Sequence, residues 1–241
     1  MRRLVLDRPH ESSFDLQGTG RDHRHHLGGV LDHQPNDWAP HAWKWFWSKN
    51  SLPRPDIVDD LVERYFSERL ISRLYLYSLA SPLQIEELLI GTLAWRYGTD
   101  GNGRPRTQKT LTIQTEPPKT PFEVAAEIVR TAQTKGARAG FAALFDGNSG
   151  RLKNVGTAFG TKLLHFGAYK EVSGEARPLI YDKNVWKGWS REPGMSAVTD
   201  PDKCVSADYL AYCEWCEEVA TAQSTTPAVV EYCLYWLGRA G

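Results

Sequence analysis

Two residues of opposite charge, Lys162 and Asp182, stand twenty positions apart, and each falls at the expected start of a helix. Gly160 permits a tight turn, and the apolar residues after it predict a helix that opens at Gly160 or Thr161. Lys162 would then lie in the first turn, where the positive end of the helix dipole disfavours a protonated ammonium. If the site is also desolvated, the pKa of Lys162 falls and its neutral amine can act as a nucleophile.

Asp182 follows the short apolar group 178–181, a position that suits the N-cap of a helix through Val185 and Trp186. A capping carboxylate is partly fixed by backbone N–H groups and can present its second oxygen to a cleft. For either residue alone, an ordinary surface Lys or a helix-capping Asp is the simpler interpretation. The combination of Lys162, Asp182 and Trp186 at this spacing instead favours a functional pair.

The elements around this pair are predicted to be short helices joined by tight loops, so the fold class is mostly α. One strand is predicted at 110–115, where Thr alternates with apolar residues. The helices are expected to begin after Asp56, at Ser81-Pro82 and at Thr120-Pro121, the last of these ending at Gly136, and to continue over 137–145, 206–222 and 226–237.

Two regions follow from this pattern. Residues 1–55 are predicted to be an irregular N-terminal segment that packs on the core through the aromatic cluster 42–47. Residues 56–241 are predicted to form the helical domain. Within it, segment 151–190 would contain a hairpin that turns at Gly160 and the candidate catalytic residues Lys162 and Asp182. The His-rich run 21–26 has no recognisable metal-ligand spacing, so no metal site is predicted there.

The formal net charge is zero, yet the charges are segregated along the chain. Residues 130–170 are rich in Lys and Arg, whereas residues 200–231 are rich in acids, so one face could hold a polyanion. No secretory signal and no apolar run long enough to span a membrane is present, and four Cys are expected as reduced thiols. We therefore expect a cytoplasmic protein, and we further expect a bacterial monomer.

The segments Gly160-Thr161-Lys162 and Asp182–Trp186 resemble the motifs of helix-hairpin-helix DNA glycosylases, in particular 8-oxoguanine DNA glycosylases and their prokaryotic OGG-fold relatives. In that family a G-x-G-T-K hairpin supplies a catalytic Lys, and a V-D-x-x-x-W segment about twenty residues later supplies the Asp. Here Ala158 and Tyr181 replace the first Gly and the Val. The resemblance implies two helical lobes around a cleft, with Lys162 as nucleophile and Asp182 as its carboxylate partner.

The resemblance also implies the partner and the reaction. Double-stranded DNA would present a damaged or modified base, extruded into a pocket and excised to leave an abasic site, with β-lyase nicking as a further step. The base would be 8-oxoguanine or a bulky modified base, such as the glucosylated hydroxymethylcytosine that phage-defence relatives remove. The predicted base-pocket residues are Phe166, Trp186 and Tyr209, and the predicted DNA contacts are Gly160, Thr161, Gly101, Asn102, Arg104, Arg106 and Lys153.

No cofactor is expected. The spacing of Cys204, Cys213, Cys216 and Cys233 does not suit an iron–sulfur cluster, and two of them, three residues apart on a predicted helix, would share a buried face. Two other functions stay open from the sequence. One is a non-catalytic helix-hairpin-helix DNA-binding protein, and the other is a helical protein-interaction domain that ignores DNA.

Overall fold

The computed structural model describes residues 35–65, 70–112, 119–146, 152–172, 175–192, 194–195 and 198–240. Over these ranges the chain is mostly helical, as predicted, with one antiparallel pair of three-residue strands, β1 and β2. The His-rich run 21–26 lies outside the described residues. The elements are β1 (Pro35–Asp37), α2 (Pro40–Lys49), α3 (Pro55–Tyr65), β2 (Leu70–Ser72), α4 (Arg73–Ser78), α5 (Ile85–Tyr97), α6 (Gly103–Thr112), α7 (Pro121–Phe145), α8 (Thr157–Ala168), α9 (Lys183–Trp189), the 3-10 helix η1 (Pro201–Lys203), α10 (Ser206–Ala222) and α11 (Pro227–Arg239).

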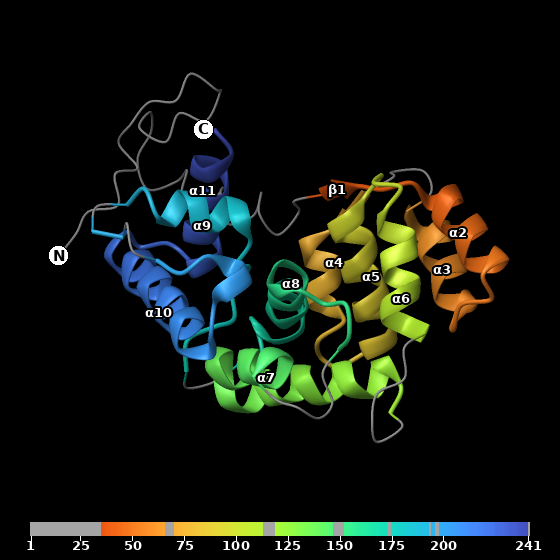
Figure 1. Ribbon diagram of the computed structural model, residues 1–241, viewed down its shortest axis with the longest axis horizontal. Helices are drawn as coiled ribbons and strands as arrows, with labels where there is room; N and C mark the ends of the chain where they lie inside the picture. Colours follow the sequence, from red (N-terminus) through yellow and green to blue (C-terminus); the bar gives the residue numbers. More distant parts are fainter. Residues whose placement is uncertain are drawn as a thin grey trace.

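The helices form two lobes (Figure 1). Helices α2 to α6 gather on one side and α9 to α11 on the other, while α7 runs along the base and α8 stands between them. Helix α8 is buried from Phe159 to Ala168, and α5 is buried from Leu88 to Trp95. A helix that is buried on every face belongs in a core, so these two helices form the centre of the molecule.

Several element boundaries differ from the sequence predictions. Residues 40–49, expected to be irregular, form α2, because Trp43 and Trp47 lie four apart and bury the same helical face. The helix predicted from Ser81-Pro82 begins at Ile85 instead. The strand predicted at 110–115 is wrong for its first three residues, which end α6; residues 113–115 lie outside the described ranges.

Side-chain hydrogen bonds explain why α6 accommodates its Thr residues. The hydroxyls of Thr107, Thr110 and Thr112 each donate to the carbonyl four residues earlier, at 2.9, 3.2 and 2.8 Å. Such bonds satisfy the hydroxyl within the helix, so a β-branched residue that favours strands can remain helical.

Helix α7 confirms its predicted start and its interruption. Thr120 and Glu123 form a capping box, and Gly136 leaves helical geometry at φ 84°, between the two predicted segments. Helix α8 approaches the second segment closely. A Cβ placed on Gly160 would lie 2.7 Å from the tip of the Phe145 ring, so a larger residue there would require that ring to move. None of the described helices is long and apolar enough to cross a bilayer.

Candidate active site

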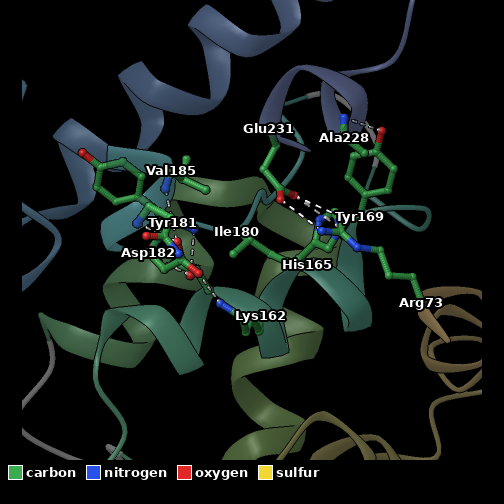
Figure 2. A network of polar contacts seen from close by, with 12 residues as sticks. Arg73, Lys162, His165, Tyr169, Ile180, Tyr181, Asp182, Val185, Ala228 and Glu231 are labelled. Atoms are coloured by element: carbon green, nitrogen blue, oxygen red, sulfur yellow. Dashed lines mark hydrogen bonds and ion pairs between the residues drawn. The ribbon is translucent and has the colours of Figure 1, made fainter. Parts of the chain in front are cut away.

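Lys162 and Asp182 meet between the lobes. The Lys162 ammonium donates to Asp182 Oδ2 at 2.8 Å and to the Ala158 carbonyl at 3.1 Å (Figure 2). Their side chains are only 5% and 17% exposed. The structure thus brings together the two residues that the sequence pattern singled out, in a setting largely removed from water.

Asp182 is held by the helix that it caps. Its Oδ1 accepts from the backbone N–H groups of Asn184 at 3.1 Å and Val185 at 3.2 Å, which leaves Oδ2 to face Lys162. This is the predicted N-cap of α9. Burial works against ionisation, but the Lys162 charge and the two N–H groups outweigh it and lower the pKa of Asp182 below its ordinary value.

Lys162 does not lie in a first helical turn, as the sequence had suggested. Helix α8 begins at Thr157, with Gly156 at its N-cap, so Lys162 is in the second turn, where the dipole has little effect. Burial is the main cause that lowers the pKa of Lys162, and the charge of Arg96 adds to it, whereas Asp182 opposes the shift. Desolvation therefore favours the neutral amine.

Two of the predicted DNA contacts, Gly160 and Thr161, lie in the helix that carries Lys162. Both are buried within α8. The Thr161 hydroxyl donates to the Thr157 carbonyl at 2.8 Å and accepts from the Tyr181 N–H at 3.0 Å. This hydroxyl ties the residue before Asp182 to the helix that carries Lys162, so its role is to position the pair.

The pair lies on a cavity of about 180 Å³ formed by both lobes. Its walls combine charged, aromatic and apolar groups, and they come from Arg73, Trp95, Arg96, Lys162, Ile180, Asp182, Asn184, Glu231 and Tyr235. Trp95 and Tyr235 supply aromatic surface and Ile180 supplies an apolar contact. A flat aromatic molecule with polar edges suits such a lining.

A buried ion pair completes one wall of the cavity. Arg73 donates to both oxygens of Glu231, at 3.1 and 3.3 Å, and both side chains are at most 4% exposed (Figure 2). Burial raises the pKa of Glu231 more than Arg73 lowers it. A buried carboxylate on a cavity, with its acceptor capacity only partly used by Arg73, can accept hydrogen bonds from a ligand.

His165 supports this ion pair from α8. Its Nδ1 lies 2.9 Å from the Pro178 carbonyl, which can only accept, so Nδ1 carries the proton. Nε2 then accepts from the Tyr77 hydroxyl at 2.6 Å and from Arg73 at 3.3 Å. Burial, together with the charge of Arg73, keeps the pKa of His165 well below its ordinary value, so the ring is neutral.

The residues predicted for the base pocket do not line the cavity. Phe166 is buried behind Trp95, with ring centroids 5.1 Å apart. Tyr209 is a core residue whose hydroxyl bonds the backbone of Leu179, and the Trp186 indole donates to the Val198 carbonyl at 3.1 Å. Neither the helical pattern nor the aromatic character of a residue reveals whether its side chain faces a cavity. The way in which the two lobes meet decides which side chains line it.

The remaining predicted DNA contacts lie on the surface of the α5–α6 region and before α8. Gly101, Asn102, Arg106 and Lys153 are exposed and Arg104 is partly exposed. Gly101 and Asn102 precede α6, which begins at Gly103, whereas Arg104 and Arg106 lie within that helix. The Asn154 amide donates to the Lys109 carbonyl at 3.4 Å, which places the segment with Lys153 beside the end of α6.

A family model described as "Putative 8-oxoguanine DNA glycosylase OGG-like protein" matches residues 29–235. The chain belongs to this OGG-like family. The match spans both lobes and includes Lys162, Asp182 and every residue that lines the cavity. No curated protein and no solved structure matches the chain. The family assignment therefore agrees with the resemblance carried by Gly160–Lys162 and Asp182–Trp186.

Sequence reasoning missed several residues of this OGG-like cavity: Arg73, Trp95, Arg96, Ile180, Asn184, Glu231 and Tyr235. For two of them a signal was present. Glu231 is the one charged residue between Pro227 and Leu237, and Arg73 is the one charged residue of the short, mostly apolar helix α4. A lone charge within an apolar helical run must be buried with a partner, although only the fold identifies that partner.

Proposed function

We propose that this OGG-like protein is a DNA glycosylase in which Lys162 attacks C1′ of an extruded nucleotide and Asp182 assists. The observation that supports this most is the amine and carboxylate contact at 2.8 Å on the wall of a cavity. A base inside a duplex is inaccessible to such a recessed pair, so the nucleotide must leave the stack. The family match supports a glycosylase, and the choice of base is our proposal.

The reaction begins with Lys162 as a neutral amine, whose proton passes to solvent because burial disfavours the ammonium, while Asp182 stays ionised. The amine then forms a bond to C1′ as the N-glycosidic bond breaks. The electron pair of that bond leaves with the base, and the base takes up a proton that Asp182 relays from the nitrogen of the new bond. Positive charge that develops on the sugar is stabilised by the carboxylate, as in glycoside hydrolysis. Opening of the sugar ring gives a Schiff base, whose hydrolysis releases an abasic site and whose β-elimination nicks the strand.

The cavity suits a base as leaving group. In the proposed complex the base lies against Trp95 and Tyr235, and the Glu231 carboxylate accepts hydrogen bonds from its edge. Candidate substrates are 8-oxoguanine and a bulky modified cytosine such as glucosylated hydroxymethylcytosine. Arg96 at the cavity, with the surface residues Arg104, Arg106 and Lys153, would bind the DNA phosphates.

Borohydride trapping tests the proposal directly. Duplexes that contain 8-oxoguanine or glucosylated hydroxymethylcytosine are incubated with the protein and borohydride, and released bases are identified by mass spectrometry. We expect a covalent protein–DNA adduct and a released base. Lys162→Ala should form no adduct, whereas Lys49→Ala, which changes an exposed Lys of α2, should match the wild type.

Two outcomes would contradict the proposal. If Lys162→Ala releases the base as fast as the wild type, Lys162 is not the nucleophile. If the wild type binds these duplexes in a salt-dependent manner but releases no base, the non-catalytic DNA-binding alternative is correct.

A further inference from the structure

Helix α11 has an outward aromatic face. Tyr232, Tyr235, Trp236 and Arg239 follow at intervals that place them on one side of the helix. The Trp236 ring lies 6.0 Å from that of Tyr232 and 5.8 Å from that of Tyr235, both edge to face. The Arg239 guanidinium lies 5.4 Å from the Trp236 ring. We name these four residues the α11 aromatic surface.

This surface is accessible and its surroundings are basic. Trp236 is 44% exposed, which is unusual for so large an apolar side chain. Arg239, Lys187 and Arg191 are also exposed, and Arg191 bonds the Leu237 carbonyl at the end of α11. The segments 183–191 and 232–240 contain no Asp or Glu, and Glu192 follows directly after Arg191. Exposed aromatic rings beside several cations suit a polyanion that carries flat rings.

The surface is continuous with the active-site cavity. Tyr235 lines the cavity and also contacts Trp236, and the Arg239 guanidinium lies 3.4 Å from the Tyr235 hydroxyl. Asn184 of α9, the helix that carries Lys187, lines the same cavity. A DNA strand with one nucleotide in the cavity must continue across the protein surface at the rim of that cavity. The α11 side of the rim offers stacking partners.

We propose that the α11 aromatic surface binds an unpaired nucleotide adjacent to the extruded one, with its base on Trp236 and its phosphate near Arg239. The proposal rests on the function proposed above. It requires an unpaired neighbour, because a base within a duplex has both faces covered by its own stack. The protein should therefore prefer DNA that is locally unpaired around the target over fully paired DNA.

Equilibrium binding to lesion-free DNA tests this proposal separately from catalysis. Fluorescence anisotropy compares a fully paired duplex, the same duplex with a short thymine bubble, and single-stranded oligothymidylate. We expect Trp236→Ala to weaken binding to the bubble and the single strand by about tenfold and to leave the paired duplex nearly unchanged. Trp236→Phe, which keeps a ring, should retain most of the affinity.

Trp45→Ala is the matched control, because Trp45 is 61% exposed on α2 in the other lobe, with Lys49 over its ring at 4.7 Å. It should change none of the three affinities. Thermal melting of each variant shows whether it is folded. Equal losses on paired and unpaired DNA, or no loss with Trp236→Ala, would overturn the proposal. If the protein excises no base but still prefers bubble DNA, the proposed glycosylase function is refuted and the proposal for the α11 aromatic surface stands.

Discussion

Lys162 Nζ and Asp182 Oδ2 lie 2.8 Å apart, and this contact joins the second turn of α8 to the N-cap of α9. The contact serves two purposes in the fold. It gives a buried ammonium a counter-ion, and it orients the one carboxylate oxygen that the cap leaves unused. Changes at either residue therefore have separable effects on stability and on chemistry.

Substitution of Asp182 should separate the cap from the charge. An Asn side chain can still accept the N–H bonds of Asn184 and Val185, so Asp182→Asn should remain folded. Its base-release rate should fall by about 100-fold or more, because the developing sugar charge loses its partner. Asp182→Ala also loses the cap, so its free energy of unfolding, measured in urea, should be about 1 kcal/mol lower than that of Asp182→Asn. An Asn variant with wild-type single-turnover rates would show that the carboxylate has no chemical role.

The pH dependence of trapping should report Lys162. Because burial lowers its pKa from the ordinary value of 10.5, the neutral amine and the trapping rate should appear at lower pH than for an exposed Lys. Asp182 raises and Arg96 lowers this pKa. Asp182→Asn should therefore move the rising limb to lower pH, and Arg96→Gln should move it to higher pH.

The same shifts set the sign for stability. The folded state releases the Lys162 proton before the unfolded state does, so the free energy of unfolding should rise with pH between the lowered pKa and 10.5. The lowered pKa of Asp182 stabilises the fold above the ordinary value of 3.8, and that contribution is lost as the pH falls further. Urea titrations across pH measure both. If the pH profile of the trapping rate moves in neither Asp182→Asn nor Arg96→Gln, this electrostatic account of the Lys162 pKa is wrong.

The Arg73–Glu231 pair should be costly to break from one side. Arg73→Met or Glu231→Leu alone leaves a buried charge without its partner and should lower the free energy of unfolding by about 3–5 kcal/mol. The double variant leaves no unpaired charge and should lose less than the sum of the two. A double-mutant cycle from urea unfolding gives the coupling. Additive losses would mean that the pair contributes no interaction of its own.

The contact between α9 and α11 should not tolerate a methyl group. A Cβ on Gly188 would lie 1.9 Å from the Leu234 carbonyl oxygen, and one on Gly238 would lie 1.7 Å from that of Asn184. Gly188→Ala should thus force the helices apart, destabilise the protein by about 3 kcal/mol and displace Asp182 from Lys162. Gly156→Ala is the control, because a Cβ there meets nothing within 4 Å. Equal melting temperatures for the two variants would disprove this close packing.

Local sequence predicted the parts of the fold that depend on neighbours in the chain. The helix start at Thr120, the break at Gly136, the cap formed by Asp182 and the helices predicted at 206–222 and 226–237 all follow from nearby residues. The structure has them, with the last helix at Pro227–Arg239. The strand prediction for Thr110 to Thr115 is wrong at residues 110–112, which the structure describes as helical. There, hydroxyl bonds within α6 and the burial of Leu111 outweigh β-propensity.

The sequence by itself determined that the chain is mostly helical, and it singled out the motif that holds Lys162 and Asp182. Only the tertiary structure decided which side chains share a cavity with them. Phe166 and Tyr209 are in the core, whereas Arg73, Glu231 and Tyr235 face the site. The physical reason is that a helical pattern shows which face of a helix is apolar. Burial of a charge such as Glu231 depends on a partner 158 residues away, brought close only when the two lobes pack.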